Sequence, residues 1–132
     1  MKDRLRVLSV NHNRILREGI SALLEMDRNF ELIDSVATAD AAVEAFAATH
    51  PDLTLVDLDL PAEGSLDVIS RIRQIDAAAW IIGLTIDELD ERCLQAVIVG
   101  VSSLLAKDQI GTMLIPLIRT GGLVSTFKLD GL

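Results

Sequence analysis

The strongest constraint on the fold of this chain is a fivefold alternation between short apolar runs and segments of helical spacing. Runs rich in Val, Ile and Leu occur at residues 5–10, 30–36, 53–56, 80–84 and 103–106. In the segments that follow these runs, apolar residues recur every three or four positions, which is the spacing of one helix face. The alternation predicts an α/β fold: a doubly wound, five-stranded parallel sheet with helices on both faces.

The last two helical segments differ in length. Helical spacing before the final apolar run extends from Leu89 to Gly100. The segment after it, residues 112–119, contains Pro116, which has no amide proton and whose ring clashes with the preceding turn of a helix. We therefore expect a short or kinked helix at the end of the fold.

Composition limits the partners of this chain. It has 132 residues, a length that suits one domain, and half of them are hydrophobic, which excludes a disordered tail. With 12 basic and 20 acidic residues the formal net charge is -8, which argues against nucleic acid or an anionic membrane as a direct partner. Cys93 is the only cysteine, no apolar run is long enough to span a bilayer, and no signal peptide is evident. We expect a cytoplasmic protein with one domain over residues 1–122 and a linker or tail over 123–132.

Polar residues follow four of the five apolar runs. They are the NHN segment at 11–13, Asp57, Thr85 and Lys107. In a doubly wound sheet, ligands bind outside the carboxyl ends of the strands, so these residues should lie at one edge. An aspartate nucleophile, a threonine donor and a lysine counter-charge can together hold a phosphoryl group. Any one of them could also be polar only because a loop begins there.

The motifs at these strand ends resemble the receiver domain of bacterial two-component response regulators. The matching segments are PDLTLVDLDLP at 51–61, GLT at 83–85, and Gly100 followed by LLAKD at 104–108. The resemblance covers residues 4 to about 122. It implies a flavodoxin-like (CheY-like) sheet of strand order 2-1-3-4-5, a function in phosphorelay signal transduction, and no enzymatic activity of its own.

The start of the chain resembles one branch of that family, the NarL/LuxR-type regulators. RVLSV at 6–10, LREGI at 16–20 and the Lys107-Asp108 ending carry this similarity. Members of the branch usually carry a C-terminal LuxR-type helix-turn-helix, which these residues do not include. The resemblance therefore implies transcription regulation in which DNA is bound only through such an output domain.

Three residues match the functional positions of the family. Asp57 corresponds to the phosphoryl-accepting aspartate, Thr85 to the hydroxyl that contacts the phosphoryl oxygens, and Lys107 to the lysine that pairs with the acid. This agrees with the role of each residue inferred from its chemistry. We expect direct contact between Asp57 and Lys107, because the ammonium is the strong counter-charge available in the pocket.

The metal positions depart from the family pattern. Asn11 and His12 stand where the family has two adjacent acids that hold Mg²⁺, a cation that prefers hard oxygen ligands. Asp57 and Asp59 are the acids that remain among the metal positions. Asp59 either adds one carboxylate oxygen to the site or is a solvated loop carboxylate. The pattern predicts no cofactor, or weakly bound Mg²⁺.

Two functions remain open from the sequence. In one, the domain is a degenerate receiver that acts by protein interaction without phosphorylation. In the other, Asp57 accepts a phosphoryl group from a sensor histidine kinase. The first is favoured because the metal acids are replaced and because Leu104 stands where the family usually has a switching aromatic residue.

The sequence also predicts a homodimer. The fourth helix, fifth strand and fifth helix carry apolar stretches at 96–99, 104–105 and 113–115, and not all of these residues can face the core. An exposed apolar patch on a small domain usually marks a partner surface. Alternatively, Ile98 and Val99 are covered by the fifth helix and residues 123–132, which would leave a monomer.

Overall fold

The computed structural model describes residues 4–87 and 90–121, which form a parallel sheet between two layers of helices. The strands are β1 (Leu5–Val10), β2 (Phe30–Val36), β3 (Leu53–Asp57), β4 (Ile81–Thr85) and β5 (Ser103–Ala106). Their order is β2-β1-β3-β4-β5, and every neighbouring pair is parallel. The predicted strand order is confirmed, and the strands deviate from the predicted ranges by at most one residue.

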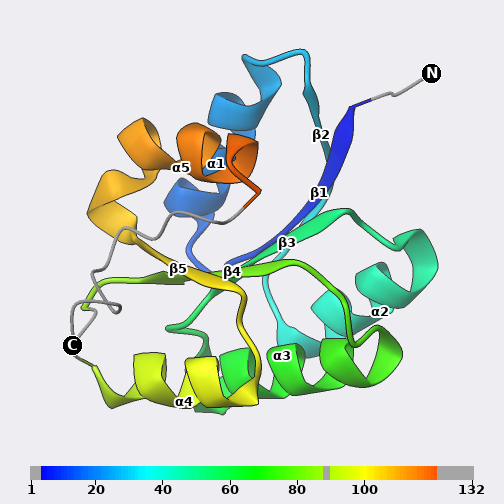
Figure 1. The fold of residues 1–132 in the computed structure, drawn as a ribbon, viewed down its shortest axis with the longest axis vertical. Helices are drawn as coiled ribbons and strands as arrows, with labels where there is room; N and C mark the ends of the chain where they lie inside the picture. Colours follow the sequence, from blue (N-terminus) through cyan, green and yellow to red (C-terminus); the bar gives the residue numbers. More distant parts are fainter. Residues whose placement is uncertain (1–3, 88–89, 122–132) are drawn as a thin grey trace.

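The helices cover the two faces of the sheet unequally. They are α1 (Arg14–Glu25), α2 (Ala39–Thr49), α3 (Gly64–Ile75), α4 (Glu91–Val99) and α5 (Ile110–Arg119), with single 3₁₀ turns η1 (Pro61–Glu63) and η2 (Lys107–Gln109). Figure 1 shows α1 and α5 on one face and α2, α3 and α4 on the other. This is the doubly wound arrangement that the alternation predicts.

Side-chain caps fix the starts of three helices. Asn13 accepts the amide proton of Leu16 at the start of α1, and Thr38 does the same for Ala41 at the start of α2. Asp90 accepts the amide proton of Arg92 at the start of α4. Each cap satisfies a backbone donor that the first turn of a helix leaves unpaired. The loops that follow β1, β2 and β4 therefore turn into helices at defined residues.

Helix α5 begins two residues earlier than the sequence predicts. It starts at Ile110 and continues through Pro116, which lies in its second half. The proline removes only one intrahelical hydrogen bond, while the apolar face of the helix packs on the sheet through the buried side chains of Ile110, Leu114, Leu117 and Ile118. The prediction of a short helix is confirmed at ten residues, and its predicted start was wrong.

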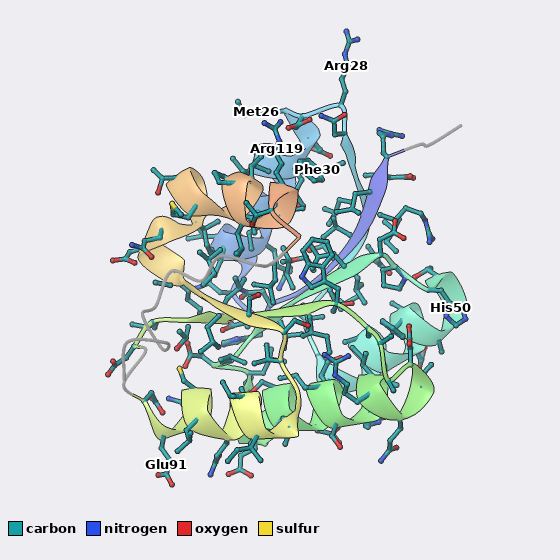
Figure 2. The ribbon with its side chains drawn as sticks, in the orientation of Figure 1. Met26, Arg28, Phe30, His50, Glu91 and Arg119 are labelled. Atoms are coloured by element: carbon teal, nitrogen blue, oxygen red, sulfur yellow. The ribbon has the colours of Figure 1, made fainter. Side chains whose placement is uncertain are left out.

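The core has two parts, one on each face of the sheet, and Figure 2 shows side chains filling both layers. Strands β3 and β4 are buried at every position, as expected for central parallel strands. Glu91, labelled in Figure 2, begins α4 and points away from the sheet. The central strands are therefore covered on both faces, and the polar residues lie at the ends of the strands.

Some predicted features lie outside the described residues. These are Leu89, expected in the fourth helix, and the linker or tail over 123–132. Across residues 4–87 and 90–121, none of the helices has the length and apolar content needed to cross a bilayer.

Candidate functional site

The polar strand ends lie together at the carboxyl edge of the sheet. Asp57 and Thr85 are the last residues of β3 and β4, Asn11 directly follows β1, and Lys107 directly follows β5. Because all five strands are parallel, these ends share one edge. The prediction of a single polar site at this edge agrees with the strand order.

Asp57 is fully buried and its two carboxylate oxygens differ in their contacts. Oδ1 lies 2.6 Å from Nζ of Lys107 and accepts the amide proton of Asp59 at 2.9 Å. Oδ2 has no hydrogen-bond partner among the described residues, and Nδ1 of His12 lies 3.9 Å from it. The expected contact between Asp57 and Lys107 is present, on one oxygen only.

Asp59 takes part in the same ion network. Its Oδ2 lies 2.8 Å from Nζ of Lys107, and its Oδ1 lies 3.3 Å from Nη1 of Arg92. The side chain is 24% exposed, so it is neither a freely solvated loop carboxylate nor a fully buried one. Both of its oxygens face cations supplied by the chain.

Lys107 is held in its charged form by the two acids. Burial by itself would lower the pKa of its ammonium group, but hydrogen bonds to Asp57 and Asp59, with the charges of these acids, raise the pKa above its ordinary value. The side chain is 17% exposed and lies between the two carboxylates. A buried charge with this geometry is paired on two sides, which offsets part of the cost of its desolvation.

Asn11 and His12 are placed differently, although they are adjacent. Asn11 is fully buried: its Oδ1 accepts the amide proton of Asn13, and its Nδ2 has no partner among the described residues. Its backbone carbonyl accepts a hydrogen bond from Arg17. The side chain of His12 is 48% exposed and only its Nδ1 approaches Asp57. The buried position therefore holds a neutral amide, and the half-exposed one an imidazole.

The hydroxyl of Thr85 is bonded away from Asp57. It donates to the backbone carbonyl of Asp87 at 3.2 Å and accepts from Sγ of Cys93 at 3.3 Å. Burial raises the pKa of the Cys93 thiol, which keeps it protonated and able to donate. Thr85 thus lies at the predicted edge, but its hydroxyl contacts the loop after β4 and α4.

Comparison with protein families identifies this arrangement. Residues 7–119 match the response regulator receiver domain. The chain belongs to this family. A two-component response regulator of the LuxR family from Aurantimonas sp. SI85-9A1 has a solved structure that is 28% identical and superimposes with a TM-score of 0.85, over 97% of this chain and 92% of that one. The receiver is therefore similar in its whole fold to a LuxR-type regulator.

Two curated relatives are similar to this chain over most of its length. The nitrate/nitrite response regulator protein homolog of Haemophilus influenzae is 29% identical over 108 residues, which are 82% of this chain and 52% of that protein. The chemotaxis protein CheY of Halobacterium salinarum is 30% identical over 76% of this chain and 82% of its own length. The chain thus spans about half the length of the nitrate/nitrite relative. It is the receiver domain of a two-component response regulator of the NarL/LuxR type.

Two residues of the receiver site were not predicted from the sequence. Arg92 contacts Asp59, and Cys93 contacts the hydroxyl of Thr85. Both lie in the first turn of α4, in a segment with no match to a recognised motif. Their contacts depend on how the loop between β4 and α4 turns, and the spacing of apolar residues carries no information about that turn.

Proposed function

We propose that this receiver acts by protein contact without phosphorylation, because the acids of its pocket are paired with cations of the chain itself. The observation that carries the proposal is the position of Lys107 between Asp57 and Asp59, at 2.6 and 2.8 Å. With Arg92 on the second oxygen of Asp59, the two carboxylates face two resident cations. Arg92 also pairs with Asp90 at 3.1 Å, so these three acids and two cations carry a net charge of 2 minus 3, or one negative, with every acid beside a cation.

A pocket whose acids are already paired with resident cations does not fit Mg²⁺. The metal prefers oxygen ligands in near-octahedral array and must be attracted by uncompensated negative charge. Asn11 contributes a neutral side chain whose oxygen already accepts a hydrogen bond, and His12 contributes an imidazole, which suits softer metals. Among the residues that the structure describes, no three His, Cys, Asp or Glu side chains form a group able to hold a metal.

The second candidate function is phosphoryl transfer from a sensor histidine kinase to Asp57. One observation favours it: Oδ2 of Asp57 has no hydrogen-bond partner among the described residues. A free carboxylate oxygen is the chemical requirement for a nucleophile. Lys107 would then supply the positive charge at the pocket.

Acetyl phosphate decides between the two functions. We expect that incubation with acetyl phosphate and Mg²⁺ leaves the intact mass of the protein unchanged. We also expect that beryllofluoride changes the structure of the protein little. The matched control is Asp57→Asn, which has no nucleophile. A mass increase of one phosphoryl group in the wild-type protein, absent in Asp57→Asn, would establish the second function instead.

The contact surface that we propose is the exposed face of α4, with β5 and α5 beside it, in a two-fold homodimer. On α4, Ile98 is 74% exposed and Leu94 is 63% exposed. Leu104 and Leu105, on β5, are buried. Exposed apolar side chains on one helix favour a partner surface. Val99 instead packs against the core on the α2, α3 and α4 face, whereas the buried residues of α5 belong to the core on the other face.

Light scattering tests the dimer. We expect a dimer mass at micromolar concentration, and a monomer mass for Ile98→Glu. Ile15→Glu is the matched control, because Ile15 is 82% exposed on α1, on the opposite face of the sheet. A monomer mass for the wild-type protein, or equal behaviour of both variants, would contradict the proposed surface.

A role in transcription regulation is proposed from the relatives. The Aurantimonas protein is named a LuxR-family regulator, and the H. influenzae relative is about twice the matched length. We infer that DNA would be bound by a separate output domain, since this receiver carries a formal net charge of -8.

A further inference from the structure

We propose that Arg92 is a positioning residue that closes the acid pocket to divalent cations by holding Asp59, and that it thereby fixes the start of α4. The inference rests on the proposed function, because it names one of the cations that pair with the acids of the pocket. Arg92 belongs to the first turn of α4, whereas Asp59 belongs to the loop after β3. Their contact links the pocket to a helix on its rim.

The contacts of Asp59 show why Arg92 is decisive. Lys107 occupies Oδ2 and is shared with Asp57, so one ammonium neutralises only half of the charge of the two acids. Nη1 of Arg92, 3.3 Å from Oδ1, is the second cation beside Asp59, and the same guanidinium also pairs with Asp90. Without Arg92, Oδ1 of Asp59 would lose this cation, and the pocket would become more negative by one charge.

Asp90 orients the guanidinium. Its carboxylate caps α4 by accepting the amide proton of Arg92, and its Oδ2 lies 3.1 Å from Nη2 of the same residue. The hydrogen bond and charge of Asp90, together with the charge of Asp59, raise the pKa of Arg92. The arginine therefore stays charged and lies between the helix cap and the pocket.

The next residue provides a second link from α4 to the strand ends. Sγ of Cys93 lies 3.3 Å from Oγ1 of Thr85 and 3.2 Å from the backbone carbonyl oxygen of Asp87, and its single proton can be donated to either. Successive residues of one helical turn thus contact the loop after β3 and the end of β4. Leu94 and Ile98, the exposed apolar residues of the proposed partner surface, follow in the same helix. A change in the pocket can therefore reach this surface through the first turn of α4.

Titration with Mn²⁺ tests the charge role of Arg92. We expect Arg92→Gln to bind Mn²⁺ about fivefold more tightly than wild type, since one unit of positive charge is removed a few ångströms from the carboxylates. Arg92→Lys keeps the charge and should restore weak, wild-type binding. The matched control is Arg71→Gln on α3, which removes the same charge from an ion pair with Asp40 and Asp67.

Hydrogen exchange tests the link to α4. In Arg92→Gln we expect faster exchange of the amides at 94–99 and unchanged exchange in α3, with Asp59→Asn giving the same pattern and no added effect in the double variant. Equal Mn²⁺ affinity of wild type and Arg92→Gln, or an equal gain in Arg71→Gln, would overturn the role of Arg92. Unchanged α4 exchange would overturn the link. Tight Mn²⁺ binding by the wild-type protein would instead refute the proposed function.

Discussion

The two halves of the acid pocket differ in how completely their polar atoms are paired. The paired half comes from the ends of β3 and β5: Oδ1 of Asp57, the carboxylate of Asp59 and the ammonium of Lys107 form contacts of 2.6 to 2.9 Å. In the other half, Oδ2 of Asp57 and Nδ2 of Asn11 have no partner among the described residues, and Thr85 is bonded elsewhere. Only the paired half contains a lysine bound between two carboxylates.

This difference indicates which half stabilises the fold. A buried carboxylate paired with an ammonium destabilises the folded state little. A buried carboxylate that loses its partner destabilises the folded state by several kcal/mol. Polar atoms that are already unpaired are less costly to change, because little is lost when they are replaced. We therefore expect substitutions in the β3 and β5 half to have the larger effects.

The largest effect is expected for Lys107→Met. It leaves Asp57 buried without a counter-charge, and we expect a loss of about 3–5 kcal/mol in the free energy of unfolding, measured by urea denaturation. Arg119→Ala is the control: it breaks an ion pair with Asp27 in which the arginine is 60% exposed, and should cost less than about 1 kcal/mol. Equal losses of stability in Lys107→Met and Arg119→Ala would show that the buried ion pairs contribute no more than an exposed one. The double variant Lys107→Met with Asp57→Asn should recover most of the stability.

Acids at the unpaired half should have the next largest effect. Asn11→Asp with His12→Asp adds two carboxylates beside Asp57, and without a divalent cation we expect a loss of about 1–3 kcal/mol by repulsion and burial. Mg²⁺ should restore the stability by binding the folded state. The measurement is the free energy of unfolding with and without Mg²⁺.

The control for these acids is Asn13→Asp. It adds a charge at the exposed cap of α1, where aspartate is also a good cap, and should change neither quantity. If the double variant binds no Mg²⁺, the expected recovery of stability is refuted, and Lys107 and Arg92 are then sufficient to exclude the metal.

Alkaline pH should weaken the paired half. The pKa of Lys107 is raised in the folded protein, so its stabilising contribution is complete below its unfolded pKa of about 10.5 and is lost as pH rises through the folded value. We expect the free energy of unfolding to fall above about pH 10.5, and Lys107→Met to lack this step. The chain has no tyrosine, so no phenol titrates in this range. A fall of the same size in Lys107→Met would assign it to other groups.

Thr85→Val should have the smallest effect. It removes a hydroxyl bonded to the Asp87 carbonyl and to Cys93, and hydrogen bonds of this kind contribute about 1 kcal/mol. Because the hydroxyl is bonded away from Asp57, the alkaline step of Lys107 should remain. The measurement is the free energy of unfolding as a function of pH. If the alkaline step of Lys107 is missing in Thr85→Val, the two halves act as one unit.

The fold was predictable because its signal is distributed over the whole chain. Each strand is a run of buried Val, Ile and Leu, and each helix shows its own face, so a local error such as the start of α5 does not change the topology. Pro116 does not end the helix early, because a single removed hydrogen bond is small beside the burial of four side chains.

The candidate site was predictable only in part. The contact between Asp57 and Lys107 follows from two strand ends of a parallel sheet, and it is confirmed. Their roles in phosphoryl chemistry stay predictions. The contacts of Asp59 with Lys107 and Arg92 depend on the direction of loop side chains after β3 and β4, which no periodicity encodes. The sequence therefore indicated where the pocket is, and left open how its charges are balanced.

The strand order also determines when the pocket can form during folding. No two neighbouring strands are joined by a hairpin: β1 lies between β2 and β3, and β5 completes the sheet at one edge. Contacts between residues far apart in sequence form slowly, because a long loop must close before each one is gained. Lys107 comes from the last strand end, so Asp57 has no ammonium partner until β5 docks. We expect the buried carboxylate of Asp57 to gain its counter-charge when β5 docks. The ion pair between Asp57 and Lys107 is therefore expected to form late in folding.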